Sequence, residues 1–400
     1  MTPSTTIAIV GGGMAGASLA LLLAHQLPDY RILLIEKNAL HTAAPEQLAL
    51  PSFDARSTAL SCSTRDILQA IGIWDALQPS LEPIRAVHVS ERQRAAGMLM
   101  RADDVALPAL GYVVENRHLG QQLLHAIAQQ PAITCLAQTS IERLHFTADT
   151  AVLSTATEMH EVALAVIADG SQSLLRQQLG IAVDEMPYYQ RAIIANVVTE
   201  KPHSGIAYER FTDTGPIALL PLQMVNNQHR AALVWTLPDA DAETVLTLDD
   251  DAFMARVMER FGNRCGRLLA VGARNTYPLV LAQAREQVRT RVVLLGNAAH
   301  SLHPVAGQGF NLILRDCQAL ANTLTQAAHD QRDVGSLSVL QRYLQQQQWD
   351  QHKTITASDW LPKLFTSRHT PQKALRTAAL LGLDFLPGLR EWFAREATGI

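Results

Sequence analysis

The sequence is poor in cysteine and has no cluster of positive charge. Cys62, Cys135, Cys265 and Cys317 stand far apart, and no two of them form a C-x-x-C pair. This spacing argues against a zinc site or a disulfide framework and fits a reducing compartment. The formal net charge is −4 and lysines and arginines are dispersed, so we do not expect a nucleic-acid partner.

The N-terminal segment lacks charge altogether. Residues 1–28 contain no Asp, Glu, Lys or Arg, as a signal peptide core or a membrane span also would. A signal peptide needs a positively charged start, however, and the first arginine is Arg31. Three glycines directly after the β-branched run "TTIAIV" indicate a strand that enters a turn. We therefore expect a cytoplasmic protein.

Length and composition set the scale of the fold. The chain has 400 residues, of which 48% are hydrophobic and 18% charged. That composition is typical of a folded globular protein, and the length exceeds what one hydrophobic core usually serves. We expect two domains and a helical tail.

Residues 5–36 predict a strand, a glycine-rich turn, a helix and a second strand. Gly11, Gly13 and Gly16 fit G-x-G-x-x-G: the first allows a tight turn, the second lets a pyrophosphate approach, and the third lets the helix pack on the strand. The helix N-terminus attracts phosphate. Glu36 ends the second strand, where a carboxylate accepts hydrogen bonds from a ribose. The pattern indicates dinucleotide binding, and both NAD and FAD remain open.

A second apolar strand in "ALAVIADGSQSLLR" (163–176) ends at Asp169-Gly170. Ser171 and Ser173 follow as candidate caps of a helix. On local pattern alone, an ordinary strand–turn–helix and a ligand-binding turn are equally good interpretations.

The stretch "GNAAHSLHPVAGQGFNL" (296–312) contains no Asp, Glu, Lys or Arg. Pro304 fixes the backbone, and Gly307, Gln308 and Gly309 lead into a helix that begins near Phe310. The first N–H groups of that helix would stabilise the negative charge of a reduced isoalloxazine ring.

Two histidines in the same stretch raise the question of a metal. His300 and His303 are three residues apart, but no third ligand is evident and Pro304 follows directly. Capping or hydrogen bonding in the core is the better interpretation, and no metal is expected.

Together these stretches resemble the single-component flavoprotein aromatic hydroxylases, the group of para-hydroxybenzoate hydroxylase. Within that group the chain is most similar to the ubiquinone-biosynthesis hydroxylases, through "FDARSTALS" (53–61), "ERFTDTGPIALLPL" (209–222) and "HPVAGQGFNLILRD" (303–316). The likeness runs to about residue 330. Leu-His-Pro before the glycines and Phe-Asn-Leu after them, with Asn311, resemble the hydroxylases of 2-octaprenyl-6-methoxyphenol.

The resemblance implies roles for particular residues. Arg56 and Arg117 match arginines that approach the flavin and its phosphates, although ion pairs with Asp54 and Glu115 are the structural alternative. Asp169, with Gly170, matches an acid that contacts FAD and NADPH. A further set matches the ribityl-binding position and the loop and helix start along the flavin ring: Asn297, Pro304, Gly307, Gln308, Gly309 and Asn311. Most of the family has Asp at position 297; an amide still accepts a ribityl hydroxyl.

The resemblance also implies a reaction. NADPH reduces FAD, O₂ adds to give a flavin C4a-hydroperoxide, and one oxygen is transferred to a prenylated phenol. The sequence has no second G-x-G-x-x-G, so NADPH (or NADH) would bind transiently in a surface groove. Tyr208 and Arg210, on a strand expected to face the flavin, and His303 beside Pro304 are candidate substrate-lining or catalytic residues. The alternative for the strand is a structural wall, with Arg210 paired to Glu209 or Asp213.

The expected fold is α/β: a Rossmann-like FAD-binding domain, an inserted mixed β-sheet domain for substrate, and C-terminal helices. We assign residues 1–71, 113–181 and 281–330 to the first, 72–112 and 182–280 to the second, and 331–400 to the helical region.

The tail at residues 374–393 is apolar with arginines toward its ends. It either docks on the core or contacts the inner face of the cytoplasmic membrane, and a biosynthetic assembly is a further candidate partner. Three other functions remain open: a flavin reductase or dehydrogenase of the geranylgeranyl-reductase kind, another aromatic hydroxylase of the same fold, and a non-catalytic binding protein.

Overall fold

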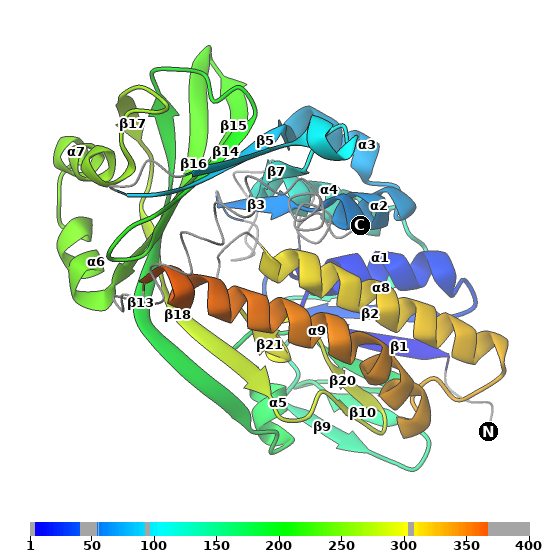
Figure 1. The fold of residues 1–400 in the computed structure, drawn as a ribbon. Helices are drawn as coiled ribbons and strands as arrows, with labels where there is room; N and C mark the ends of the chain where they lie inside the picture. The colour runs from blue at the N-terminus through cyan, green and yellow to red at the C-terminus, as the bar shows by residue number, and fades with distance from the viewer. Residues whose placement is uncertain (1–4, 41–53, 55, 93–96, 303–307, 367–400) are drawn as a thin grey trace.

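The computed structural model describes residues 5–40, 54, 56–92, 97–302 and 308–366. In this part of the chain the strands form four sheets. Figure 1 shows the two largest sheets side by side, one with α1 and α8 beside it and one with α6 and α7 on its far side.

The six-stranded sheet carries the predicted nucleotide-binding motif. In spatial order its strands are β19 (Val288–Arg289), β20 (Val292–Leu294), β12 (Leu164–Ile167), β1 (Thr6–Val10), β2 (Arg31–Glu36) and β8 (Ile133–Ala137). All neighbours are parallel except β19, which is antiparallel to β20. Both faces of this sheet are covered, which explains why its central strands are continuously apolar. The strands predicted at 5–10 and 31–37 are confirmed.

Successive side chains of β1 point to opposite faces of the six-stranded sheet and pack in two different layers. Ile7 and Ile9 pack among the helices α1 (Met14–Gln26), α4 (Asn116–Ala128) and α8 (Gln308–His329). Ala8 and Val10 face a small antiparallel sheet and α5 (Leu174–Gln178) on the other side. The strands of that small sheet are β11 (Met159–Val162), β10 (Ala151–Ser154) and β9 (Arg143–Phe146).

The nine-stranded sheet is mixed and strongly curved (Figure 1). In spatial order its strands are β21 (His300–Ser301), β18 (Asn275–Ala284), β13 (Val183–Thr199), β16 (Gln228–Pro238), β15 (Pro216–Val225), β14 (Ile206–Phe211), β5 (Ala86–Glu91) and β6 (Gly97–Arg101), and β17 (Leu268–Val271) pairs with β13. The pairs are antiparallel except for β14 with β5.

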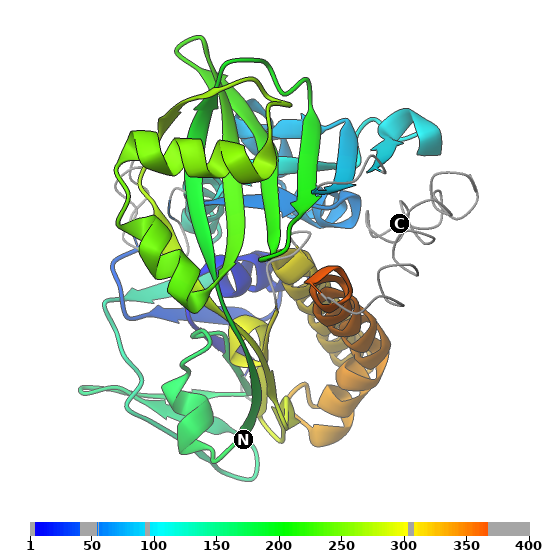
Figure 2. The ribbon, with the colours of Figure 1, turned by 60° about the vertical axis from the view of Figure 1, so that its left-hand side comes forward.

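The two faces of this sheet are covered by different elements. Figure 2 shows α6 (Asp239–Leu246) and α7 (Asp250–Phe261) lying across one face, which we call the outer face. Their side chains pack there with fully buried residues such as Ile193, Leu233 and Trp235. The alternating residues form the inner face, which is turned toward a three-stranded sheet. The strands of that sheet are β3 (Ser57–Leu60), β7 (Gly111–Glu115) and β4 (Glu82–Ile84), and α2 (Cys62–Ala70) and α3 (Trp74–Leu77) lie beside it.

Glu115, at the end of β7, joins these two sheets. One carboxylate oxygen accepts hydrogen bonds from Asn196 of β13 and Arg230 of β16, each at 2.8 Å. The other accepts a hydrogen bond from Arg117 at 3.1 Å, and His118 lies 3.6 Å away. Burial alone would raise the pKa of Glu115, but the bonds with His118 and Arg230 and the arginine charges outweigh it and lower the pKa to about 2.

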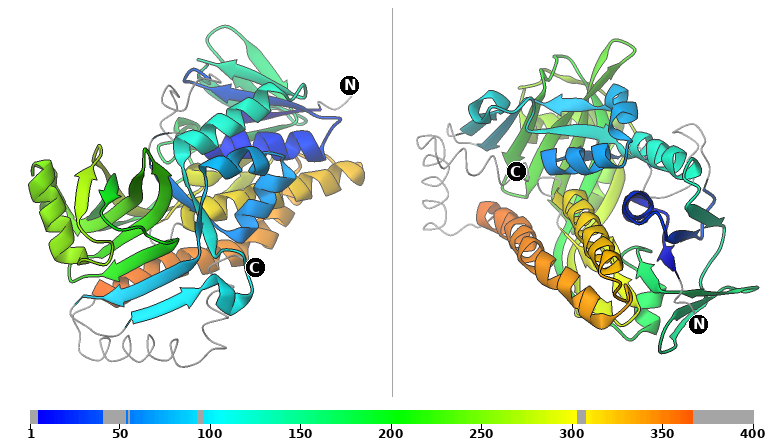
Figure 3. Two further views of the ribbon diagram at one scale, coloured as in Figure 1. Left: turned by 90° about the horizontal axis from the view of Figure 1, so that it is seen from above. Right: turned by 90° about the vertical axis from the view of Figure 1, so that its right-hand side faces the viewer.

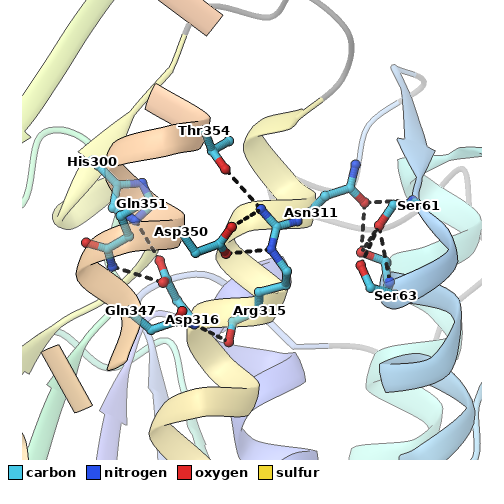
Figure 4. A network of polar contacts seen from close by, with 11 residues as sticks. Ser61, Ser63, His300, Asn311, Arg315, Asp316, Gln347, Asp350, Gln351 and Thr354 are labelled. Carbon is cyan, nitrogen blue, oxygen red and sulfur yellow. Dashed lines mark hydrogen bonds and ion pairs between the residues drawn. The ribbon is translucent and has the colours of Figure 1, made fainter. Parts of the chain in front are cut away.

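The helices α8 and α9 (Leu337–Thr366) lie side by side (Figure 3). Figure 4 shows the polar contacts between them. Arg315 of α8 pairs with Asp350 of α9 at 2.6 Å, and Asp316 accepts a hydrogen bond from Gln351 at 2.9 Å. Asp316 also contacts His300 at 2.7 Å with both side chains buried. The contact of His300 with Asp316 ties β21 to α8, and the other contacts tie α8 to α9.

The domain boundaries stay a prediction. The sheets show which of the predicted segments pair with one another. Strands β5 and β6 fall within 72–112 and join the same sheet as the strands of 182–280. By contrast, β21 falls within 281–330 and pairs with β18 of the nine-stranded sheet. In 331–400 the helix α9 is present, whereas the tail at 374–393 lies outside the described residues. Among the described helices, none has the length and apolarity to cross a membrane.

We predict that Glu115→Gln destabilises the fold in a pH-dependent way. The pKa of Glu115 is depressed from 4.5 to about 2, so its stabilisation is present above about pH 4.5 and lost as pH falls toward 2. At pH 7 the loss is up to roughly 3 kcal/mol in the free energy of unfolding. Urea denaturation at pH 7, 4 and 3 measures it. Glu82→Gln is the matched control, because Glu82 makes no ion pair among the described residues; equal losses at pH 7 and 3 would contradict the assignment.

Candidate functional site

The first turn of the six-stranded sheet leaves no room for side chains. Gly11 has a φ of +110°, and a Cβ there would lie 2.4 Å from the carbonyl oxygen of Ala168. A Cβ on Gly16 would lie 1.9 Å from the carbonyl oxygen of Gly11. The helix α1 then starts with Gly13 as its N-cap and without a side-chain cap. Its first N–H groups therefore remain available to a ligand phosphate.

Glu36 lies at the carboxyl end of β2, beside this turn. Its carboxylate is buried and accepts hydrogen bonds from the backbone of Gly12 at 2.7 Å and from both nitrogens of Asn38, at 2.9 and 2.7 Å. Each carboxylate oxygen can accept more than one hydrogen bond. The geometry thus holds Glu36 where a ribose beside the glycine turn would reach it.

Asp169 follows β12 and meets the same turn. Its backbone nitrogen would be 2.9 Å from a Cβ on Gly11, so the two loops touch. Its Oδ1 is buried and has no hydrogen-bond partner among the described residues, and burial raises the pKa of its carboxyl. Gly170 has a φ of +97°, with no atom within 4 Å of where a Cβ would stand. Of the two candidate caps, Ser171 and Ser173, it is the Ser173 side chain that caps α5, by accepting a hydrogen bond from the backbone of Arg176.

The loop after β20 and the start of α8 complete this edge. Asn297 lies exposed in η4 (Gly296–Ala298), and the adjacent Gly296 approaches Ala15 of α1. The helix α8 begins at Gln308, close to the predicted start. A Cβ on Gly309 would meet no atom of the described residues within 4 Å. His303, Pro304 and Gly307 lie outside the described residues, and their predicted roles stay predictions.

Asn311 forms hydrogen bonds within the protein that its predicted cofactor role did not include. Its side-chain oxygen accepts hydrogen bonds from the Ser61 backbone at 2.9 Å and the Thr64 hydroxyl at 2.7 Å. Its amide nitrogen donates to the carbonyl of Ala59. Figure 4 shows this link between the start of α8 and the Ser61 cap of α2. Asn311 therefore fixes the position of the helix start whether or not it also contacts a cofactor.

Arg56 and Arg117 are brought together with a third arginine. The backbone N–H groups of Asn116 and Arg117 donate to the carbonyls of Arg56 and Asp54, at 2.7 and 3.0 Å. With Arg230, which sequence reasoning missed, the two arginines line a hollow of about 390 Å³. Arg230 carries no motif, and only the pairing of β16 and the position of Glu115 identify it.

Both predicted arginines also form the ion pairs considered as alternatives. Arg56 contacts Asp54 at 2.5 Å and lies over the ring of Tyr277, 4.5 Å from its centroid. Arg117 contacts Glu115 at 3.1 Å. Carboxylates that hold the arginines in this way orient the guanidinium groups around the hollow.

The predicted orientation of Tyr208 and Arg210 is wrong. The Tyr208 ring packs against the ring of Phe261 of α7, with the two ring centroids 6.0 Å apart, and against the ring of His88. Arg210 lies near Gly262, just after α7. Both side chains are thus on the outer face. Successive residues of a strand point to opposite faces, so Ala207 and Glu209 occupy the inner face instead.

The alternative ion pairs for Arg210 are also not found. Asp213 pairs with Arg260 at 2.8 Å and with Arg92 at 3.6 Å. Within the described ranges Arg210 has no ion pair, and burial together with the charges of Arg264 and Arg92 lowers its pKa.

His300 takes the role of a core histidine, through its buried contact with Asp316. Within the described part of the chain, no three His, Cys, Asp or Glu side chains are grouped as metal ligands.

The residues at the carboxyl edge fit FAD. Within the described ranges, Asp169 offers a buried acceptor without a donor, α1 offers N–H groups without a side-chain cap, and Gly309 leaves open space at the start of α8. A dinucleotide with a flavin ring would use all three: hydroxyls for the acceptor, phosphates for the helix end and a flat ring for the open space.

Comparison with known proteins agrees. The FAD binding domain family matches residues 4–349. Ubiquinone hydroxylase UbiL of Rhodospirillum rubrum is 33% identical over 395 residues, covering 98% of this chain and 89% of the relative. The 3-demethoxyubiquinol 3-hydroxylase of Escherichia coli is 32% identical over 400 residues, covering 99% of each. Human ubiquinone biosynthesis monooxygenase COQ6 is 28% identical, covering 96% of this chain and 90% of the relative.

Solved structures share the fold. The p-nitrophenol 4-monooxygenase PnpA from Pseudomonas putida DLL-E4 has a TM-score of 0.77 at 17% identity and covers 98% of both chains. PqsL of P. aeruginosa, solved with 2-aminobenzoylacetate, has a TM-score of 0.76 at 19% identity, covering 94% of this chain and 99% of that one. The expected fold class is confirmed. The chain belongs to the FAD binding domain family of flavoprotein monooxygenases, with ubiquinone hydroxylases among its relatives.

Proposed function

We propose that this protein hydroxylates the ring of a polyprenylated phenol in ubiquinone biosynthesis, using FAD, NADPH and O₂. The observation that carries the proposal is the set of loops at one edge of the six-stranded sheet, where Gly11, Asp169 and the start of α8 converge. The names of the relatives support the reaction and the pathway. The 2-polyprenyl-6-methoxyphenol substrate rests on the motifs around residues 303–312 alone.

The residues of the chain divide the work of holding the cofactor. The N-terminus of α1 receives the pyrophosphate and Glu36 the adenosine ribose. Asp169 accepts from cofactor hydroxyls through its buried oxygen, and Arg56 and Arg117 bring positive charge toward the flavin and its phosphates. When bound, FAD supplies the activation of O₂ that no side chain provides.

The net reaction balances with one nicotinamide. A ring C–H, O₂, NADPH and a proton give a ring C–OH, water and NADP⁺. NADPH acts as a transient reductant, since the sequence has no second G-x-G-x-x-G to hold it. A polyprenyl substrate partitions into the bilayer, so we further propose peripheral contact with the inner face of the cytoplasmic membrane and with other enzymes of the pathway.

The reaction is tested by aerobic NADPH oxidation with purified, FAD-loaded protein. We expect faster oxidation when a short-chain 2-prenyl-6-methoxyphenol is added, and one ¹⁸O atom in the product under ¹⁸O₂. The same compound with its hydroxyl methylated is the matched control. A product that is reduced and carries no ¹⁸O would identify a reductase instead, and a protein that takes up no FAD would refute the cofactor assignment.

We predict that Gly309→Val weakens FAD binding without unfolding the apoprotein. A side chain at Gly309 meets no described atom within 4 Å, so the apoprotein should melt within a few degrees of wild type. The added methyl groups would enter the space given to the flavin ring, and overpacking of about 1–3 kcal/mol raises the FAD dissociation constant roughly 5- to 150-fold.

Flavin fluorescence titration of the apoprotein measures this constant. Asp169→Asn is a second variant at the same site, because it keeps the shape and removes the charged acceptor; a loss of about 1.5–3 kcal/mol corresponds to roughly 10- to 150-fold weaker binding. Wild-type affinity in both variants would show that the flavin lies elsewhere.

A further inference from the structure

The inner face of the nine-stranded sheet carries a row of partly exposed apolar residues. Ile194 of β13, Val234 of β16 and Ala218 of β15 lie opposite one another in the strand register. All three are partly exposed among the described residues. Their outer-face neighbours Ile193 and Trp235 are at most 1% exposed. We call Ile194, Val234 and Ala218 the apolar row.

Arginines lie at one end of the apolar row, and a carboxyl group lies at the other. Ile194 belongs to the lining of the hollow that contains Arg56, Arg117 and Arg230. At the other end, Ala218 lies opposite Glu209 of β14. Three strand spacings separate Glu209 from Ile194, which is about 14 Å. A substituted aromatic ring is shorter than that and can lie flat on the row with one polar group at Glu209.

Glu209 is held in an apolar setting. On its other side it lies opposite Val89 of β5, which in turn lies opposite Met98 of β6. Its carboxylate has no hydrogen bond or ion pair within the described ranges, although the residue as a whole is partly exposed. Burial raises the pKa of Glu209 to about 7.

Few other charges face Glu209. On the same face β14 presents Ala207 and Phe211, and β15 presents Pro216 and Leu220 beside Ala218. On β5 the same-face residue Glu91 lies opposite Phe211, one diagonal step from Glu209. The charged groups around Arg210, including Arg92 and Arg264, belong to the outer face. Among the described residues, no cation therefore pairs with Glu209.

We propose that Glu209 is a catalytic residue, which accepts the hydroxyl proton of the phenol while the ring lies on the apolar row. This inference rests on the proposed function. The O–H bond of the phenol breaks, the proton passes to a carboxylate oxygen of Glu209, and the electron pair stays on the phenolate oxygen. No oxidant or reductant takes part in this step. The phenolate is more electron-rich at its ring carbons and accepts an electrophilic oxygen more readily.

The position of Glu209 suits this task. A general base is most effective when its pKa lies near the working pH, and an apolar wall with no nearby cation supplies that condition. Because the residue as a whole is partly exposed, its proton can also return to solvent after turnover. By contrast, a structural carboxylate of this fold, Glu115, is held ionised by arginine and histidine.

The test compares wild type with Glu209→Gln and Glu209→Asp in FAD-loaded protein. Glu185→Gln is the control, because Glu185 is an exposed carboxylate on β13 outside the site. Substrate-dependent kcat is measured from pH 5.5 to 10 with 2-prenyl-6-methoxyphenol. For wild type we expect kcat to rise through about pH 7. For Glu209→Gln we expect a fall of about 100-fold or more at pH 7.5.

The same series separates proton transfer from a structural role. In Glu209→Gln the rate should recover toward pH 10, since a phenol ionises unaided near about pH 10. Glu209→Asp should fall between wild type and Gln, and Glu185→Gln should match wild type. A Gln variant within twofold of wild type with the same pH profile would overturn the assignment.

Thermal melting gives a readout that does not depend on activity. The pKa of Glu209 is raised in the folded protein, so stability is retained below about pH 4.5 and decreases as pH rises through 7. We expect the melting temperature of Glu209→Gln to exceed that of wild type by an amount that grows from pH 5 to 8. A difference that does not change with pH would count against the desolvated carboxylate.

The result for the wild-type protein separates a failure of the proposed function from a failure of the role of Glu209. Wild-type protein that inserts no ¹⁸O into any phenol refutes the proposed function, and the role of Glu209 with it. Wild-type protein that hydroxylates normally, beside a Gln variant that does the same with an unchanged pH profile, refutes only the role of Glu209.

Discussion

The contact between Gly16 of α1 and the carbonyl oxygen of Gly11 sets the geometry of the whole site. No side chain fits between them, since a Cβ would come within 1.9 Å of that oxygen. The contact brings α1 directly onto the end of β1 and points its uncapped N-terminus at the carboxyl edge of the sheet. The loop of Asp169 meets the same turn, and α8 packs on α1 within the same hydrophobic core. Each loop that receives the cofactor is therefore positioned by one close approach of backbone.

The nine-stranded sheet supplies the other wall, and its two faces are specialised. Apolar residues on the outer face bury themselves against α6 and α7 and hold the sheet rigid. The inner face faces β4 and β7, is joined to them through Glu115, and leaves the apolar row partly exposed. In the proposed function, arginines at one end of that row and a carboxyl group in apolar surroundings at the other would give an aromatic substrate a defined orientation. Rigid strands place such groups more accurately than loops do.

Local motifs predicted the turns and the helix cap at the carboxyl edge because each depends on the chain's own short-range geometry. The glycine turn, Glu36 and the Ser173 cap follow from spacing within a single strand–turn–helix unit. The substrate wall depends on long-range pairing, which spacing does not reveal. The orientation predicted for Tyr208 and Arg210 is wrong because the polar residues of this strand, Tyr208 to Arg210, are consecutive and give no local sign of which face is buried. Arg230 became evident only once β16 was paired with β13 beside Glu115.

A crystal structure of the protein with FAD and a 2-prenyl-6-methoxyphenol tests the central claim, that catalysis occurs between the carboxyl edge and the inner face. The account predicts the pyrophosphate at the N-terminus of α1, a cofactor hydroxyl on Asp169, and the phenol ring on Ile194, Val234 and Ala218 with its oxygen within hydrogen-bond distance of Glu209. Density for the ring on the outer face, beside Tyr208 and Arg210, or a flavin away from Asp169, would contradict it.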